Sequence, residues 1–292
     1  MVVNNRLTFG KLIIYFLIVA LCASIILPFW MIFVSSFTDE GTLVRNGGLI
    51  LVPASPTLKA YKQVFSDNRI WKSFQSSVFI TAAGTLVHLL VTGMMAYPLS
   101  KKLKYNTIIG FFVYFTTLFS GGIIPYYILI KNLNLLNTLW YFVITGMLGA
   151  YHMILMRNFF AELPPELEES ALIDGAGYFK VLYRIVLPLS LPLLATIGLM
   201  AMVARWNTWL APVIYMPAAS DRWPLMTTLM LMLQNAFNPP TIDQIDMMNY
   251  VLPPKESFKY ATLVVATLPI MCVYPFLQKY FAKGLLIGAI KG

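Results

Sequence analysis

Residues 12–34 read LIIYFLIVALCASIILPFWMIFV and contain no charged side chain. A helix needs about 20 mainly apolar residues to cross the hydrocarbon core of a bilayer. The run is too long for the apolar region of a secretory signal peptide, and no small-residue cleavage site closes it. We therefore expect it to be retained as a first membrane-spanning helix.

Five further apolar stretches are long enough to span. Their approximate bounds are Phe74–Leu99, Ile108–Ile130, Leu139–Met156, Leu187–Tyr215 and Ala261–Phe281. The apolar part of the stretch after Trp223 is too short to span, so we expect Pro224–Leu233 to form a short helix that lies on the outer membrane surface or dips into it. The pattern predicts an all-α membrane protein in which six transmembrane helices make a single domain over residues 1–292.

The composition agrees with this class. Hydrophobic residues make up 59% of the chain and charged residues 11%, whereas a soluble domain carries about 25% charged residues. The net charge of +9 calls for no nucleic-acid partner, because Lys and Arg are spread over many loops. Cys22 and Cys272 both lie in apolar runs, which favours packed thiols over a disulfide or a metal cluster.

The orientation follows from the basic residues, which favour the cytoplasmic side. With the N-terminus inside, the inner segments hold slightly more Lys and Arg than the outer ones, and the compact turn Lys101-Lys102-Leu103-Lys104 is the clearest contribution. Both termini are then cytoplasmic. Two long segments, about 35–73 and 217–260, become outer loops that offer a docking surface.

The chain lacks several motifs that carry chemistry. It has no G-x-x-x-x-G-K-[ST] loop, so we expect any ATP and Mg²⁺ to be bound by another subunit and no cofactor by this one. His88 and His152 each lie in an apolar run. A single histidine in that setting is more often hydrogen-bonded packing than a metal ligand or a proton relay.

The most informative inner segment is the loop at about 160–188. It contains Leu163–Gly177, which reads LPPELEESALIDGAG. Prolines suit a helix start, acidic residues favour the positive end of the helix dipole, and the glycines stop the helix. Ala171 and Gly175 lie four residues apart, so we expect a flat helical face that either docks in a groove of another protein or belongs to an ordinary connector.

This loop resembles the conserved loop of inner-membrane subunits of ABC importers. That pattern is E-A-A, three residues, G, nine residues, I, one residue, L-P. The matching positions are Glu169, Ser170, Ala171, Gly175, Ile185, Leu187 and Pro188. Ser170 departs from the pattern by replacing the first alanine, and it is nearly as small.

The resemblance implies a coupling helix over about Leu163–Gly177 that docks into a cleft of an ATPase subunit. The residues it would assign to ATPase coupling are Glu166, Glu168, Glu169, Ser170, Ala171, Asp174, Gly175, Ile185, Leu187 and Pro188. It also implies the assembly of a type I, maltose-transporter-like importer. The partners would be a second homologous permease, two ATPase subunits, an extracytoplasmic solute-binding protein, an oligosaccharide and membrane lipid.

The likeness extends along the whole chain. Leu27-Pro28-Phe29, Val34-Ser35-Ser36-Phe37, Arg205–Pro212 and Gly288–Gly292 look like segments of carbohydrate permeases of the bacterial inner membrane. Within that group, Phe119–Pro125 and Asn134–Trp140 resemble the branch that serves aldouronate or alginate oligosaccharides. The resemblance thus implies an importer of oligosaccharides, and within that branch of acidic ones.

The fifth predicted span carries a polar cluster of Arg205, Trp206, Asn207 and Trp209. A charge at this depth is costly unless it faces protein or water, so we expect Arg205 to face the pore or a partner. Two interpretations stay open. The cluster either pairs with the sister permease or lines the substrate path, where aromatic and amide groups suit sugar rings and Arg205 suits a uronate.

The competing hypothesis is a secondary transporter or a stand-alone membrane enzyme. Proton coupling would call for carboxylates inside the membrane, and no predicted span contains Asp or Glu. We therefore expect a pore-forming subunit that is not itself an enzyme and that works by alternating access.

Overall fold

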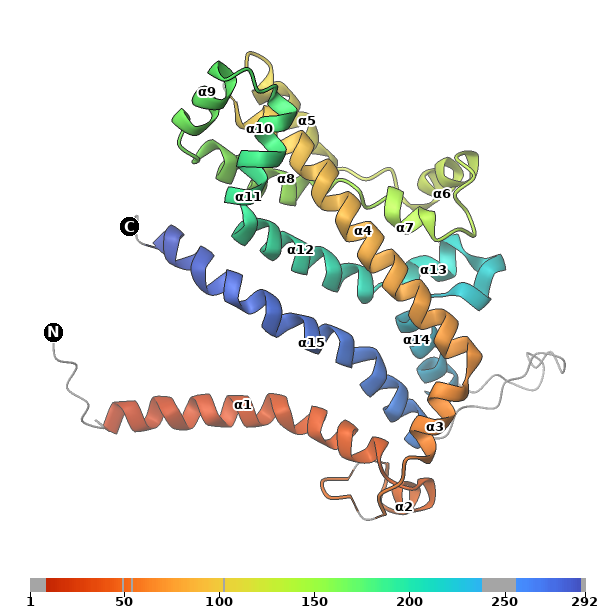
Figure 1. Cartoon of the computed structure of the whole chain (residues 1–292). Coiled ribbons are helices and arrows are strands. Elements are labelled where there is room, and N and C mark those ends of the chain that lie inside the picture. The colour runs from red at the N-terminus through yellow and green to blue at the C-terminus, as the bar shows by residue number, and fades with distance from the viewer. Residues whose placement is uncertain (1–8, 49, 54, 102, 238–255, 290–292) are drawn as a thin grey trace. The chain divides into compact units, whose positions relative to one another are not determined.

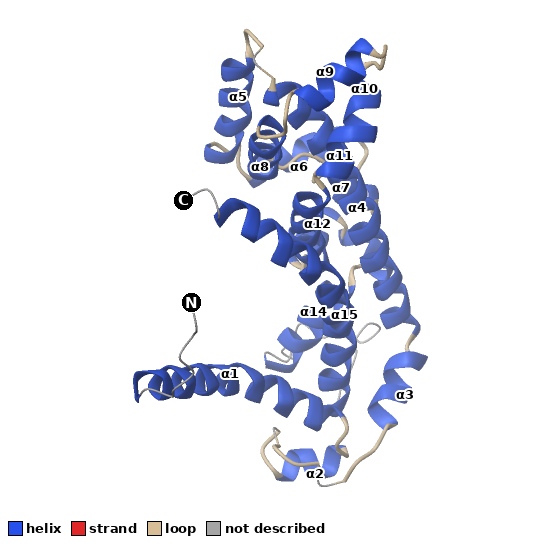
Figure 2. Cartoon of the chain, turned by 60° about the vertical axis from the view of Figure 1, so that its left-hand side comes forward, coloured by secondary structure: helices blue, strands red, loops and turns tan. Residues whose placement is uncertain are grey.

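The computed structural model describes residues 9–48, 50–53, 55–101, 103–237 and 256–289, with side chains omitted at 235–237, 274 and 276–289. These residues are almost entirely helical (Figures 1 and 2). Lys102, residues 238–255 of the predicted outer loop and the last residues, 290–292, lie outside the described part. The chain divides into two compact units, Met1–Asn68 with Leu231–Thr267 and Arg69–Met230 with Leu268–Gly292.

The first unit begins with α1 (Phe9–Ser36), which confirms the first predicted span as one continuous helix. Most of its side chains are exposed, and burial starts only at Val34. An apolar helix of this length with an uncovered surface suits contact with lipid. The end of α1 is held by Trp30, whose indole N–H donates to the Leu51 carbonyl at 3.0 Å.

Two short helices follow in this unit, α2 (Glu40–Arg45) and α3 (Lys59–Ser66), and the unit also contains the start of α15 (Glu256–Ala289). Glu40 caps that start. Its carboxylate accepts hydrogen bonds from the backbone N–H groups of Glu256 and Ser257, both at 3.0 Å, and from the Ser257 hydroxyl at 2.7 Å. A carboxylate suits the positive end of a helix, so Glu40 ties the segment that follows α1 to the start of α15.

The second unit contains α4 (Asn68–Ser100), the longest helix in it. A core around Met153, Met156 and Phe160 joins α4 to α8 (Ala150–Ala161), to α10 (Tyr178–Val181) and to α12 (Leu191–Trp206). A second core joins Ile80 of α4 to α6 (Ile123–Asn132), α7 (Trp140–Ile144) and α13 (Leu210–Tyr215).

Three of the predicted spans are each divided into shorter helices in the described part of the chain. The third consists of α5 (Asn106–Leu118) and α6, which are bent by 113°. The break contains Gly121 and Gly122, and Gly122 has a φ of +86°, which non-glycine residues rarely adopt. The sequence pattern did not predict this break, because the two glycines lie within a long uncharged stretch.

The fourth predicted span is divided into α7 and α8, with Gly146 and Gly149 between them. The fifth is divided near Ser190, where the segment Tyr178–Leu189 meets α12 at 83°, and again between Trp206 and Leu210. The segment Tyr178–Leu189 contains α10, a π-helical turn η1 (Leu182–Val186) and α11 (Leu187–Leu189).

The all-α class is nevertheless confirmed. Three described helices are long and apolar enough to cross a membrane, namely α1, α4 and the first part of α15, and the total reaches five if each bent pair is one span. The short helix predicted over Pro224–Leu233 is present as α14 (Leu225–Phe237). Its depth in the membrane stays a prediction.

Candidate functional site

The predicted coupling helix is present as α9 (Glu166–Ile173). Pro165 precedes it, and Glu166, Glu168 and Glu169 occupy its first turn, as expected from the helix dipole. Gly175 ends it with a φ of +79°, in the left-handed region where L-residues are strained. The N–H of Ala176 closes this turn by donating to the Ala171 carbonyl at 2.9 Å.

The two faces of α9 have different roles. Glu166, Glu169, Ser170 and Ile173 follow the i, i+3, i+4, i+7 spacing of one helical stripe, and all four are exposed. We call them the outward stripe. Its last member, Ile173, is 85% exposed, which is a large apolar surface to leave in water.

The opposite stripe contains Glu168, Ala171 and Leu172. Glu168 is only 8% exposed, and the other two pack against the core of this unit. This corrects the expectation that the small residue Ala171 belongs to a flat docking face. Its small side chain instead lets α9 approach its own core closely.

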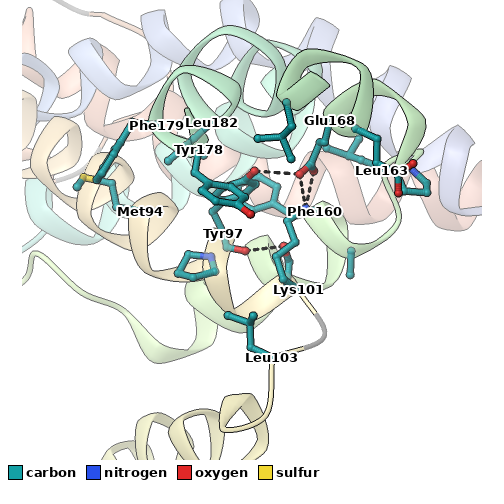
Figure 3. Close-up of a pocket in the computed structure, with 16 residues that line it drawn as sticks. Met94, Tyr97, Lys101, Leu103, Phe160, Leu163, Glu168, Tyr178, Phe179 and Leu182 are labelled. Atoms are coloured by element: carbon teal, nitrogen blue, oxygen red, sulfur yellow. Dashed lines mark hydrogen bonds and ion pairs between the residues drawn. The ribbon is translucent and has the colours of Figure 1, made fainter. Parts of the chain in front are cut away.

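Glu168 is bound inside the unit by two residues from the end of α4. Both of its carboxylate oxygens lie 2.5 Å from Lys101 Nζ, and the Tyr97 hydroxyl donates to Oε2 at 2.9 Å. Figure 3 shows the Glu168 side chain pointing from α9 toward both partners. Such charge-assisted hydrogen bonds are about twice as strong as neutral ones.

A cavity of about 980 Å³ adjoins this ion pair (Figure 3). Its walls come from the end of α4, the end of α8, α9 and α10, and they are mainly apolar and aromatic. Lining residues include Met94, Tyr97, Lys101, Phe160, Glu168, Tyr178 and Phe179. The cavity leaves part of the space between α9 and the rest of the unit without packing.

The second half of the matched motif anchors the loop. Ile185 and Leu187 pack against the core, next to the fully buried Val186. Ile185 lies in the π-helical turn η1, a rare geometry that is often found at functional sites. Pro188 is exposed in α11. Among the residues expected to serve ATPase coupling, Ile185 and Leu187 therefore pack against the same core as Ala171 and Leu172 of α9.

The remaining coupling candidates lie around the end of α9. Asp174 and Gly175 are exposed beside the outward stripe. Tyr178 and Phe179, which the sequence did not single out, are also exposed, and they extend the uncovered apolar surface beyond Ile173. Exposed aromatic residues are enriched at protein interfaces, and this signal was available in the sequence once the turn at Gly175 was predicted.

Arg205 lies at the end of α12, away from this loop, and does not meet a carboxylate among the described residues. Its Nη2 donates to the Gly146 carbonyl at 2.6 Å, in the break between α7 and α8. Its side chain runs against Gly84 of α4, where an added Cβ would overlap it. The Arg205 Nε–H is buried and has no described hydrogen-bond partner.

The two histidines form a pair that sequence reasoning missed. His88 of α4 and His152 of α8 lie 64 residues apart, with Nε2 and Nδ1 at 2.8 Å. His88 Nδ1 is also 2.9 Å from the Gly146 carbonyl. We call Arg205, His88, His152 and Gly146 the membrane polar network. The expectation that each histidine is hydrogen-bonded is confirmed, but no pattern in the sequence joined them.

The other residues of the predicted substrate path differ in their exposure. Trp206 is 5% exposed and packs edge to face on Phe74, with ring centroids 6.0 Å apart. Asn207 and Trp209 are exposed in the break between α12 and α13. No group of three or more His, Cys, Asp or Glu side chains suited to a metal occurs in the described part of the chain.

Comparison with known proteins agrees with this architecture. Residues 4–287 match the family model described as binding-protein-dependent transport system inner membrane component. Protein LplC of Bacillus subtilis strain 168 is 43% identical over 91% of this chain and 90% of its own length.

Two further similarities involve sugar transport. The polygalacturonan/rhamnogalacturonan transport system permease protein YtcP, also of Bacillus subtilis strain 168, is 38% identical over 99% of this chain and all of its own length. A crystal structure of a bacterial ABC transporter involved in import of the acidic polysaccharide alginate contains a chain with a TM-score of 0.81 and 28% identity. That match covers 95% of this chain and 100% of the other. This chain therefore belongs to the family of binding-protein-dependent transport system inner membrane components, as a permease for carbohydrate import by an ABC transporter.

Proposed function

We propose that this chain forms half of the translocation pore of an ATP-driven oligosaccharide importer, and that α9 is its docking helix for a separate ATPase subunit. The observation that carries the proposal is the outward stripe of Glu166, Glu169, Ser170 and Ile173. It is exposed on a helix whose opposite stripe is held firmly in the core.

The chemistry of the outward stripe defines the surface that would receive it. Ile173 offers an apolar anchor, and Glu166 and Glu169 offer two carboxylates one helical turn apart. Interfaces commonly combine a desolvated apolar centre with a polar rim. The matching cleft on the ATPase would therefore have an apolar floor and a basic edge.

The remaining assembly follows from the family. A second permease would complete the pore, a second ATPase subunit would complete the motor, and a solute-binding protein would deliver sugar to the outer side. ATP and Mg²⁺ would be bound by the ATPase subunits, and both termini of this chain would be cytoplasmic. Closure of the ATPase dimer would move α9, and the spans would then alternate between outward and inward access.

Acidic oligosaccharides are the substrate class that we propose. The names of two similar proteins refer to polygalacturonan and to the acidic polysaccharide alginate. In this chain, Asn207 and Trp209 are exposed in a helix break, where an amide and an aromatic face suit a sugar ring. Arg205 lies two residues before Asn207, and a guanidinium suits the carboxylate of a uronate. Trp206 is buried against Phe74 and supports the path only from behind.

The docking role is tested by Ile173→Asp and Glu169→Lys in the complete complex. We expect both variants to lose the ATPase subunits on purification and to lose ATP-driven uptake in proteoliposomes, while the solute-binding protein still binds sugar. Asp221→Lys is the matched control for retention of the ATPase subunits, because Asp221 is an exposed acid far along the chain from α9 whose ion pairs with Lys72 and Arg222, at 3.8 and 3.9 Å, contribute little. Full retention of the ATPase subunits by Ile173→Asp and Glu169→Lys would refute the proposal.

A glycine pair tests the geometry of the same helix end. Gly175→Ala forces an L-residue into the left-handed region, at a cost of about 1–2 kcal/mol. Gly177→Ala is its control, since Gly177 has a φ of −73° and both positions have open space around an added Cβ. We expect weaker ATPase retention and slower uptake for Gly175→Ala alone.

A further inference from the structure

We infer that Glu168, Lys101 and Tyr97 form a mechanical clamp that fixes α9 to the end of α4, so that movement of the docking helix is delivered to the second span. This inference rests on the proposed docking of α9. It gives Glu168 a role that differs from that of its neighbours Glu166 and Glu169, because it transmits a movement and does not contact the ATPase.

The contacts distinguish this clamp from an ordinary surface ion pair. The Glu168 side chain is 10% exposed and that of Lys101 32%. Lys101 contacts both carboxylate oxygens, and its Nζ lies 4.7 Å from the centre of the Tyr97 ring, so the ammonium is held by a cation–π contact as well. Two side chains from the end of α4, Tyr97 and Lys101, thus fix one carboxylate of α9.

The α4 side of the clamp is itself firmly held. The Asn106 side-chain amide donates to the carbonyls of Pro98 and Leu99, at 3.1 and 3.2 Å, and also to that of Lys101. Arg157 Nε donates to the same Leu99 carbonyl at 3.0 Å. These bonds satisfy carbonyls at the end of α4 that no helical N–H reaches. The backbone from which the Lys101 side chain extends is therefore held in place by Asn106 and Arg157.

The cavity explains why a polar clamp is needed here. Close packing normally transmits displacement between elements, but residues of both α9 and the end of α4 line a cavity of about 980 Å³, where they are not packed against each other. Glu168, Lys101 and Tyr97 all line that space and connect its two sides (Figure 3). Breaking the clamp should leave the outward stripe available for docking while α4 no longer follows α9.

The test uses Glu168→Gln, Lys101→Met and the exchanged pair Lys101→Glu with Glu168→Lys in the complete complex. For the two single variants we expect normal ATPase retention and a fall of about tenfold in sugar transported per ATP hydrolysed, the change expected from losing one charge-assisted hydrogen bond. The exchanged pair should recover much of the ratio, which a purely local loss of folding would not allow. Glu162→Gln, an exposed acid at the end of α8, is the control.

The outcomes separate this inference from the proposed function. If Glu168→Gln loses the ATPase subunits, Glu168 is a docking residue, and the clamp is refuted while docking by α9 stands. If the subunits stay bound and the transport ratio is unchanged in both single variants, the clamp is likewise refuted. Docking itself fails only if the outward-stripe variants Ile173→Asp and Glu169→Lys keep the ATPase.

Discussion

Two cations of the second unit, Lys101 and Arg205, are withdrawn from water in different ways. Lys101 stands beyond the end of α4 and meets the Glu168 carboxylate at 2.5 Å. Arg205 stands at the end of α12 and meets the neutral carbonyl of Gly146 at 2.6 Å. Lys101 is therefore paired with a charged carboxylate, whereas Arg205 is bound by a neutral backbone carbonyl in the break between α7 and α8.

The two cations have different partners because carboxylates are available in the segment around α9 but not within the predicted spans. The segment that contains α9 carries several acids, and one of them, Glu168, is turned inward as the counter-charge of Lys101. A carboxylate within a span is costly, and the predicted spans contain none. The membrane polar network instead uses a backbone carbonyl, which is free because α7 ends before α8 begins. The breaks that the sequence did not reveal are thus what allow a buried charge in this part of the chain.

The largest effect is expected for Gly84→Ala. The added Cβ would overlap the Arg205 side chain, so the guanidinium would leave the Gly146 carbonyl. We expect a loss of about 2–3 kcal/mol in the free energy of unfolding, the range for a hydrogen bond to a charged group. Chemical unfolding in lipid bicelles measures it.

Gly93→Ala on the same helix is the control. Its added Cβ would lie 3.6 Å from Leu187, an ordinary contact, and alanine is the better helix former by about 1 kcal/mol. It should leave stability unchanged or raise it. Equal destabilisation by both substitutions would mean that the contact of Arg205 with the Gly146 carbonyl contributes no measurable free energy of unfolding.

A smaller effect is expected for Tyr97→Phe at the end of α4. It removes the 2.9 Å hydrogen bond to Glu168 but leaves the Lys101 ion pair in place. We expect a loss of about 1–2 kcal/mol in the same unfolding measurement. Tyr183→Phe, at an exposed position nearby, should change nothing. A null result at Tyr97 would show that its hydrogen bond to Glu168 adds nothing to the Lys101 ion pair.

The smallest effect is expected for His152→Phe in the membrane polar network. His88 would lose its 2.8 Å partner but keep its contact with the Gly146 carbonyl. Side-chain hydrogen bonds within membranes contribute about 0.6 kcal/mol on average, and we expect a loss of that size. A loss as large as that of Gly84→Ala would show that the histidine pair, and not Arg205, holds the break.

The local part of the candidate site was predictable. Pro165, three glutamates and Gly175 determine α9 through helix-end preferences that act within a few residues. The sequence did not show which residues of α9 face the core and which face outward, because that depends on the other helices that pack against α9. Ala171 and Glu168 were both among the residues that the resemblance assigned to ATPase coupling, and both lie inward.

The sequence by itself determined that this protein is an all-helical membrane permease, because long uncharged runs and the spacing of the coupling loop are properties of contiguous residues. Only the tertiary structure decided where the spans break, that Glu168 meets Lys101, and that Arg205 and His88 share one carbonyl. Each of these contacts joins residues at least 58 positions apart, and such proximity arises only when separate helices pack together.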